Sequence, residues 1–198
     1  MKYKNVIKEI RGIFLTIIGS IIIVTVVNTK ALASAKVQQE SMENTLYNNE
    51  KLIVDKLSYN FTEPKRGDII IFFDHGEKGN IFEESYEYLK EVASVSYNTD
   101  TRTRLVKRVI GIPGDEIDIK GGYVYLNGEK LEETYAKGTT YSKDTALSVK
   151  VKEGTLFVLG DNREVSKDSR AFGLININQV EGKAVFRLSP LNRFGFLE

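Results

Sequence analysis

The chain of 198 residues is 41% hydrophobic and 28% charged, an ordinary globular composition that excludes a disordered or fibrous protein. It has no cysteine, which excludes thiol catalysis, disulfide frameworks and iron–sulfur sites, and its single histidine, His75, excludes a metal motif built on two histidines. Only His75 could complete a Ser-His-Asp triad, so a hydrolase with this sequence would take its proton with another base. The net charge of +1 lacks the basic excess typical of nucleic-acid binding, and we expect no nucleic-acid partner.

The N-terminal segment has the pattern of a membrane anchor. Four basic side chains against one glutamate give the first twelve residues a charge of +3, and the eighteen residues 12–29 then carry no charge. A helix of that length reaches about 27 Å, just short of a typical hydrocarbon core. Because basic residues favour the cytoplasmic side, the pattern predicts a cytoplasmic segment 1–11, a transmembrane helix 12–29 crossing the cell membrane once, and an extracytoplasmic domain 30–198.

A second interpretation of this segment comes from the small residues that follow it. Residues 31–35 (Ala-Leu-Ala-Ser-Ala) have the spacing of a signal-peptide cleavage site, and cleavage near Ala33 or Ala35 would release the rest of the chain. Against this, the apolar run is longer than a usual signal-peptide core, and Lys30 separates it from the alanines. The sequence favours a retained anchor and leaves cleavage open.

The exported part has the two-residue period of β-strands, in short β-branched and aromatic runs cut by turn residues. Asn127-Gly128 between two such runs is typical of a type I′ hairpin. The expected strands are residues 51–56, 68–73, 103–110, 116–120, 123–126, 129–131, 155–159 and 181–188. They predict a mostly β domain.

Residues 75–101 break this pattern. Ile81, Phe82, Ser85, Tyr86, Leu89 and Val92 stand near helical spacing, with acidic side chains between them. The segment is predicted to be an inserted amphipathic helix, either a solvated surface excursion or a lid that faces the substrate.

Four clusters concentrate the side chains that carry chemistry. They are residues 40–46 (Glu-Ser-Met-Glu-Asn-Thr-Leu), 66–72 (Arg-Gly-Asp-Ile-Ile-Ile-Phe), 105–115 (Leu-Val-Lys-Arg-Val-Ile-Gly-Ile-Pro-Gly-Asp) and 160–173 (Gly-Asp-Asn-Arg-Glu-Val-Ser-Lys-Asp-Ser-Arg-Ala-Phe-Gly). Taken singly, the first is typical of a turn or cap, and the second of a turn before a buried strand. The fourth is typical of a polar turn, although its charged side chains could also brace a site.

The third cluster holds a lysine in an unusual setting. Strand alternation places Lys107 on the face of Leu105 and Val109, with Arg108 on the other face. A lysine between apolar neighbours either snorkels at a sheet edge or is desolvated. Desolvation lowers the lysine pKa, and a drop of about three units would let the amine act as a base at neutral pH.

The four clusters occur in one order behind the N-terminal segment, and in this order the chain resembles the type I signal peptidases, the membrane-bound Ser/Lys proteases of bacteria, in their Gram-positive form. The matching runs are Ser-Met-x-x-Thr-Leu at 41–46, Arg-Gly-Asp-Ile at 66–69, Lys-Arg-Val-Ile-Gly-Ile-Pro-Gly-Asp at 107–115, and Gly-Asp-Asn-Arg with Ser-x-Asp-Ser-Arg-x-Phe-Gly within 160–173. The resemblance implies an antiparallel β-sheet catalytic domain of the signal peptidase type behind one N-terminal transmembrane helix.

By this resemblance Ser41 would be the nucleophile and Lys107 the general base. Ser166 would orient the lysine amine, and Asp168 and Arg170 would brace the site. The backbone N–H of Ser41 would hold part of the oxyanion.

Three further residues receive roles from the same family pattern. Gln39, two residues before the nucleophile, would be a second oxyanion donor. Met42 and Val106 would line the shallow pockets that accept small residues at the −1 and −3 positions of a signal peptide. No metal or organic cofactor is implied. The implied partners are the signal peptides of exported preproteins and membrane lipid, and nothing indicates an oligomeric state.

Two departures from the family pattern suggest a specialised enzyme. Asn44 stands where the family usually has proline, so the turn after Ser41 loses a fixed φ, although asparagine can close a turn through its own side chain. The insertion 75–101 is longer than in the small Gram-positive enzymes. Both features suggest an enzyme dedicated to a few exported proteins, such as pilus subunits.

The sequence therefore predicts a membrane-bound serine endopeptidase with a Ser/Lys dyad that removes signal peptides at the outer face of the cytoplasmic membrane. A self-cleaving Ser/Lys protease of the repressor type is one alternative, and the membrane segment argues against it. A catalytically idle, anchored β-domain that serves as an assembly factor for surface structures is the other. The presence of both Ser41 and Lys107 disfavours it.

Overall fold

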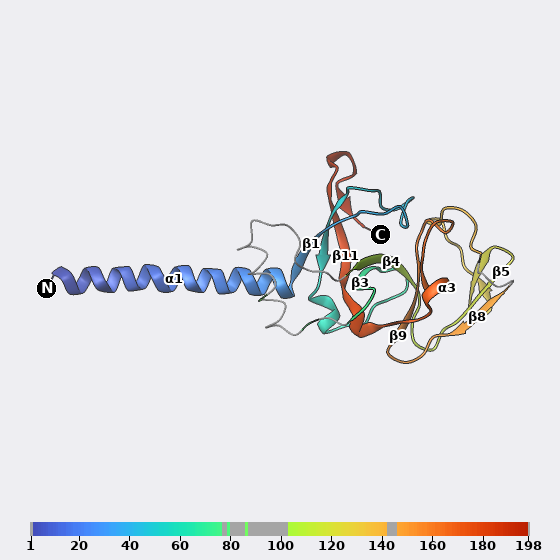
Figure 1. Cartoon of the computed structure of the whole chain (residues 1–198), viewed down its shortest axis with the longest axis horizontal. Helices are drawn as coiled ribbons and strands as arrows, with labels where there is room; N and C mark the ends of the chain where they lie inside the picture. Colours follow the sequence, from blue (N-terminus) through green and yellow to red (C-terminus); the bar gives the residue numbers. More distant parts are fainter. Residues whose placement is uncertain (1, 77–78, 80–85, 87–102, 142–145, 198) are drawn as a thin grey trace. The chain divides into compact units, whose positions relative to one another are not determined.

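The structure, a computed structural model, describes residues 2–76, 79, 86, 103–141 and 146–197. The chain divides into two compact units, residues 1–32 with 79–101 and residues 33–78 with 102–198. The first unit contains the N-terminal helix, and the second contains the β-sheets (Figure 1).

Helix α1 runs from Lys2 to Lys30, so the 12–29 segment is helical as predicted. Where its side chains are described, at residues 7–25, almost all of them are exposed, including the large apolar ones. Among the described residues, no helix has a stretch that is both long and apolar enough to cross a membrane. The membrane-spanning role of residues 12–29 stays a prediction.

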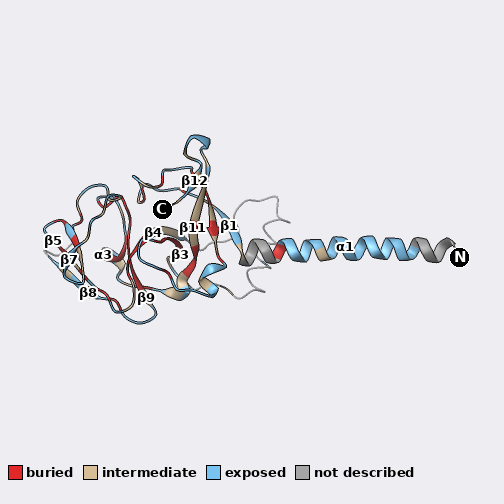
Figure 2. Ribbon diagram, turned by 180° about the vertical axis from the view of Figure 1, so that it is seen from behind, coloured by how far each residue is buried: buried red, intermediate tan, exposed pale blue. Residues whose placement is uncertain are grey.

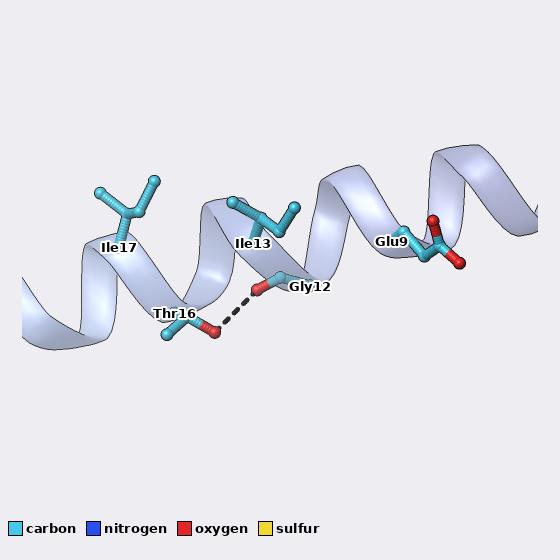
Figure 3. A pocket seen from close by; sticks show the side chains of 5 residues that line it. All are labelled: Glu9, Gly12, Ile13, Thr16 and Ile17. Carbon is cyan, nitrogen blue, oxygen red and sulfur yellow. Dashed lines mark hydrogen bonds between the residues drawn. The ribbon is translucent and has the colours of Figure 1, made fainter.

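A hollow on α1 is lined by Glu9, Gly12, Ile13, Thr16 and Ile17 (Figure 3). The hydroxyl of Thr16 donates a hydrogen bond of 3.0 Å to the Gly12 carbonyl, one helical turn earlier, as threonine often does inside helices. All five residues belong to adjacent turns of one helix, and within the described residues the Thr16 hydroxyl bonds to a backbone oxygen rather than to a basic side chain. The hollow therefore has no catalytic arrangement.

The larger of two sheets has eight strands and carries the residues expected to be catalytic. Its order is β1-β2-β11-β3-β4-β9-β10, with β12 paired to β11, and every pair with a described register is antiparallel. The strands are β1 (Leu32–Lys36), β2 (Lys51–Asp55), β3 (Ile69–Phe73), β4 (Arg104–Gly111), β9 (Thr155–Leu159), β10 (Ile175–Asn176), β11 (Val180–Ser189) and β12 (Gly195–Phe196). Strand β3, an unbroken Ile-Ile-Ile-Phe-Phe run, is buried at every residue, as expected for a strand covered on both faces.

The smaller sheet has four strands in the order β7-β6-β5-β8. They are β5 (Glu116–Lys120), β6 (Tyr123–Leu126), β7 (Glu129–Lys130) and β8 (Leu147–Lys150). Asn127 and Gly128, between β6 and β7, have φ angles of 52° and 86°, which confirms the type I′ hairpin. The described residues also include four short helical segments: η1 (Ser58–Asn60), α3 (Ser169–Phe172), η2 (Ile177–Gln179) and η3 (Leu191–Arg193).

Buried residues, in red, lie along the strands of the β unit (Figure 2). Three apolar clusters of described residues hold this unit together. One packs Ile70 and Phe72 of β3 against Val158 of β9, which covers one face of the large sheet. A second joins Ile110 of β4 to Ile117 of β5, so it binds the two sheets together. The third is built from Val37, Met42, Leu46, Leu52, Ile69 and Ala184, and it lies under the turn that contains Ser41.

The mostly β fold class is confirmed, and each predicted strand is present with ends within one residue of the expected ones. Strands β1, β8, β10 and β12 were not predicted, because they are short and poor in the continuous β-branched or aromatic runs that identify a strand. The predicted helical insertion 75–101 falls almost wholly outside the described residues, so it stays a prediction.

Candidate active site

The pair expected to be catalytic meets at the centre of the large sheet. Lys107 lies on β4 opposite Ile70 of β3, and its side chain is 1% exposed. Its Nζ donates hydrogen bonds of 2.8 Å to Ser41 Oγ and 3.0 Å to the backbone oxygen of Val106. Two side chains that are 66 residues apart in the chain thus form a direct nucleophile–base contact.

Burial changes the acidity of the lysine. Desolvation lowers the pKa of Lys107 from 10.5 to about 8, and the more distant carboxylates of Asp168 and Asp161 oppose that shift only in part. At pH 8 about half of the amine is therefore neutral and can accept a proton. Of the two alternatives that strand alternation left open, the structure selects the desolvated lysine, since β4 is a central strand and not an edge.

The turn that carries Ser41 is fixed from below by apolar packing. Met42 is 1% exposed and Leu46 is fully buried, and both belong to the cluster that includes Val37 and Leu52. The backbone N–H of Leu46 donates to the Met42 oxygen at 2.7 Å, which closes the turn. Because the residue next to the nucleophile is locked in the core, the Ser41 hydroxyl has little freedom to leave the lysine.

Two arginines near the C-terminus hold the same turn from its far end. Arg187 and Arg193 both donate to the backbone oxygen of Thr45, at 2.6 and 3.1 Å. Both also pair with the buried Glu50 carboxylate at 2.8 Å. Both arginines lie outside the four sequence clusters, so their contacts with this turn could not be predicted from those clusters.

Asn44 adopts a backbone conformation that proline cannot. Its φ is 91°, whereas the proline ring fixes φ near −65°. Asparagine is among the residues that tolerate a positive φ, and the Asn44 Nδ2 donates a hydrogen bond of 2.9 Å to the Tyr135 oxygen. The expectation that asparagine closes this turn through its own side chain is wrong, because the Asn44 amide bonds to a residue 91 positions away and the backbone N–H of Leu46 closes the turn.

The segment at 160–168 meets the nucleophile through a glycine. A Cβ on Gly160 would stand 2.2 Å from Ser166 Oγ and 2.4 Å from the Ser41 backbone oxygen, so only glycine fits. The Ser41 oxygen also accepts a hydrogen bond of 3.0 Å from the Asn162 N–H. Ser166 Oγ is buried and has no hydrogen-bond partner among the described residues. The bond expected between Ser166 and the amine of Lys107 is therefore not formed in this structure.

Asp168 and Arg170, to which the family pattern assigns a bracing role, form an ion pair. The guanidinium of Arg170 donates two hydrogen bonds of 2.8 Å to the fully buried Asp168 carboxylate. Asp168 also accepts from the Gly160 N–H at 3.0 Å, and Arg170 donates at 2.8 Å to the Arg163 oxygen. The pair thus ties the beginning and the end of the Ser166 loop together.

A second buried ion pair beside the dyad was not assigned a role from sequence. Arg108 donates to both oxygens of the Asp161 carboxylate, at 2.9 and 2.8 Å, and both side chains are buried. The Thr45 hydroxyl donates to the same carboxylate at 2.5 Å, and the Arg108 guanidinium stacks 4.1 Å above the Tyr135 ring. Arg108 and Asp161 belong to the matched runs, but nothing in the sequence pointed to Tyr135.

Arg163 holds the neighbouring segment. It is 2% exposed and donates to both oxygens of Glu133 and to the Thr140 hydroxyl, at distances between 2.6 and 2.8 Å. The backbones of Lys137 and Asn162 form a parallel bridge. Residues 133–140 are thereby fastened to the Gly-Asp-Asn-Arg run.

The remaining predicted residues lie near the dyad or in solvent. Val106 is half-buried and packs against the apolar cluster in which Met42 is buried, and the role of these two residues in substrate pockets stays a prediction. Gln39 is exposed, and its role as an oxyanion donor stays a prediction. The His75 side chain is 95% exposed, and its near neighbour is Asp74.

The fold and the site define a class of protein: a β-sheet hydrolase domain with a serine hydroxyl bonded to a desolvated lysine. Comparison with known proteins gives the family. The model of the family described as signal peptidase, peptidase S26, matches residues 10–189. The chain belongs to this signal peptidase family.

Individual relatives agree with this assignment. The chain is 36% identical to signal peptidase I of Leptolyngbya laminosa over 90% of its own length and 79% of the relative's. It is 32% identical to signal peptidase IB of Staphylococcus aureus (strain COL) over 94% of this chain and 93% of the relative. A crystal structure of signal peptidase I from Enterococcus faecalis V583, 31% identical, covers 62% of this chain and 97% of its own, with a TM-score of 0.42. Proteins of this family remove signal peptides from preproteins.

Proposed function

We propose that this chain is a membrane-anchored serine endopeptidase that removes signal peptides with a Ser41–Lys107 dyad. The observation that carries the proposal is the 2.8 Å hydrogen bond between Lys107 Nζ and Ser41 Oγ, made by a lysine whose burial lowers its pKa to about 8. A serine hydroxyl needs a base in direct contact to become a nucleophile, and a lysine is such a base only as the neutral amine.

In the proposed mechanism, Ser41 Oγ attacks the carbonyl carbon of the scissile bond while the Lys107 amine takes the hydroxyl proton. The resulting ammonium then gives a proton to the leaving amine, and an acyl-enzyme on Ser41 remains. Water activated by the neutral Lys107 hydrolyses that ester. We assign the Ser41 N–H as an oxyanion donor.

The supporting residues hold Ser41 and Lys107 in position relative to each other. The Asp168–Arg170 pair fixes the loop of Ser166, and the contact of Gly160 with both serines brings that loop against the nucleophile. We assign Ser166 to orienting the Lys107 amine in the substrate complex, where rotation about its Cα–Cβ bond gives its buried hydroxyl a partner.

Substrate selection is assigned to the surface beside the dyad. Val106 is half-buried, and we assign it to the wall of shallow pockets for small side chains at −1 and −3. Met42 belongs to the same apolar cluster but is 1% exposed, so we assign it to the floor beneath these pockets. Gln39 is assigned as a second oxyanion donor. The uncharged residues 12–29 are assigned as a single-pass anchor with a cytoplasmic N-terminus. We further propose a narrow substrate range, on the departures at Asn44 and 75–101, with pilus subunits as the first candidates.

The test is cleavage of candidate preproteins by the purified full chain in detergent. Wild-type enzyme should release a mature protein with a small residue at −1, whereas Ser41→Ala and Lys107→Met should be inactive. Both variants should keep the wild-type circular dichroism spectrum. Wild-type chain that binds preproteins without cutting any of them would overturn the proposal in favour of an idle assembly factor.

A further inference from the structure

Tyr135 contacts the supports of the active site, although it lies outside the four sequence clusters. The centroid of its ring lies 4.1 Å from the Arg108 guanidinium, and its backbone oxygen accepts from the Asn44 side chain at 2.9 Å. Its hydroxyl donates a hydrogen bond of 3.0 Å to Glu133, whose carboxylate also binds the buried Arg163. One half-buried residue thus meets three segments that surround the dyad.

The contact with Arg108 completes the surroundings of a buried cation. The N–H groups of a guanidinium all lie in its plane. In that plane Arg108 donates to both oxygens of Asp161, at 2.9 and 2.8 Å, and to the Gly67 oxygen at 2.9 Å. The flat faces of the group cannot form such bonds, and an aromatic ring suits them as a cover. The Tyr135 ring covers one face and therefore holds the guanidinium against Asp161 and away from water.

The Asp161 carboxylate in turn affects whether Lys107 keeps its proton. Charged groups that act on the lysine amine come from the 160–170 loop and from the residue after β3: Asp161, Asp168, Arg170 and Asp74. Burial lowers the pKa of Lys107 to about 8, and the Asp168 and Asp161 carboxylates act in the opposite direction. A carboxylate that is closely paired with a cation has a weaker field at the amine than an unpaired one. The pairing of Asp161 with Arg108 thus favours the neutral amine.

On the basis of the function proposed above, we propose that Tyr135 is a positioning residue whose ring keeps Arg108 paired with Asp161. The pairing shields Lys107 from the Asp161 charge, so the amine can be neutral when it activates Ser41. Without the ring, the guanidinium can turn toward water. The stronger field of Asp161 and the greater distance of the Arg108 charge would then both favour the ammonium form of Lys107. Tyr135 acts on the dyad through Arg108 and is not itself a catalytic residue.

The ring and the hydroxyl of Tyr135 can be tested separately. Burial and the Glu133 charge raise the pKa of Tyr135 above its usual value, so the phenol stays neutral throughout the pH range of an assay. Tyr135→Phe removes the hydrogen bond to Glu133 and leaves a ring over Arg108. Tyr135→Leu keeps an apolar side chain against the second apolar cluster, on which Tyr135 packs, but it has no aromatic face.

The test measures kcat/KM for preprotein cleavage by the full-length enzyme in detergent, from about pH 6 to about pH 10. Wild type and Tyr135→Phe should share a midpoint near pH 8, where half of the Lys107 amine is neutral. Tyr135→Leu should raise the midpoint by about half a pH unit or more. Its kcat/KM should therefore fall about threefold at pH 7 and return close to the wild-type value at pH 10.

A matched control removes the same kind of contact outside the active site. The Lys130 ammonium lies 3.3 Å from the centroid of the exposed Tyr123 ring in the small sheet, so Tyr123→Leu should leave both midpoint and plateau unchanged. A second change at Tyr135 perturbs the packing less than leucine does. Pentafluorophenylalanine at this position keeps the ring shape but reverses its charge distribution, so it should raise the midpoint relative to Tyr135→Phe.

The outcomes separate this proposal from the one it depends on. Wild-type enzyme that cuts no preprotein, or Lys107→Met enzyme that cuts normally, would overturn the Ser41–Lys107 mechanism and this inference with it. Tyr135→Leu enzyme with a lower kcat/KM at every pH and an unshifted midpoint would leave the mechanism standing and limit Tyr135 to packing. A Tyr135→Phe midpoint as high as that of Tyr135→Leu would assign the effect to the hydroxyl and Glu133, and it would also overturn the proposal.

Discussion

The side-chain amide of Asn44 donates a hydrogen bond of 2.9 Å to the backbone oxygen of Tyr135. This bond ties the turn that follows Ser41 to the 133–140 segment, whose Tyr135 ring covers the guanidinium of Arg108. Arg108 is the neighbour of Lys107 in β4, and its partner Asp161 accepts a hydrogen bond from Thr45. The turn that carries Ser41 and the strand that carries Lys107 are therefore held by the same connected group of hydrogen bonds and ring contacts.

The first prediction concerns Asn44→Pro, a change toward the usual family residue. A φ of 91° is closed to proline, so the turn must rearrange at a cost of about 3 kcal/mol, and we expect at least a tenfold loss of kcat/KM and a lower Tm. Asn44→Gly accepts the same φ and loses only one hydrogen bond, worth about 1 kcal/mol. Preprotein cleavage and thermal unfolding measure both. Full activity in Asn44→Pro would contradict the turn seen here.

The strands could be predicted because each is a short run of β-branched or aromatic residues between turn residues. The hairpin at Asn127-Gly128 was predictable for the same local reason, since both residues accept a positive φ. Strands β1 and β8 escaped prediction because partners distant in the chain, rather than local propensity, make them strands. Leu-Ala-Ser-Ala-Lys, for instance, has no β-branched residue at all.

The site was predictable to the extent that ordered motifs identify it. Ser41 and Lys107 were named from sequence, and the structure brings them into contact. The supports from Tyr135, Glu133, Arg187 and Arg193 could not be named, because they come from segments without a motif and act through contacts that only the fold creates. Strand alternation could place Lys107 between apolar neighbours, but it could not show that β4 is central.

A second prediction tests the contact between the two serine loops. In Gly160→Ala the new methyl group would overlap Ser166 Oγ and the Ser41 backbone oxygen, so we expect at least a hundredfold loss of kcat/KM. Gly154→Ala is a matched control at a glycine with open space around it, although its positive φ lowers Tm slightly. Steady-state cleavage and Tm distinguish the two. Near-normal turnover in Gly160→Ala would show that these loops separate in the working enzyme.

A third prediction concerns the insertion. If the segment is the surface excursion predicted from sequence, replacing residues 79–99 with a short glycine-serine linker should leave a folded enzyme, because shortening such a loop changes loop-closure entropy little. If the segment faces substrate, the ratio of kcat/KM between two preproteins should shift several-fold while Tm moves by a few degrees. A large drop in Tm with an unchanged ratio would instead assign the segment to the folded core.

A fourth prediction is that Lys107→Met stabilises the protein at neutral pH while it abolishes turnover. Burial lowers the pKa of Lys107 from 10.5 to about 8, so at pH 7 the ammonium costs about 3 kcal/mol, and loss of its two hydrogen bonds offsets about 2 kcal/mol of the gain. Between pH 8 and 10.5 the unfolded chain binds more protons than the folded one, so wild-type stability rises with pH there. By pH 10 only about 1 kcal/mol of the cost remains, less than the hydrogen-bond loss, so Lys107→Met should then be the less stable protein. Denaturant unfolding of both proteins at pH 7 and pH 10 measures the difference in their free energies of unfolding.

The last prediction is the pH dependence of cleavage, which tests whether Lys107 or His75 is the base that takes the Ser41 proton. Only the neutral amine accepts the Ser41 proton, so kcat/KM should rise tenfold per pH unit below about 8 and level off above it. Lys107→Arg should be inactive, because a guanidinium keeps its proton at every working pH. His75→Ala should match wild type, since the imidazole is 95% exposed. Turnover that survives in Lys107→Met but disappears in His75→Ala would overturn the lysine mechanism, because a lysine that is dispensable cannot be the base that activates Ser41.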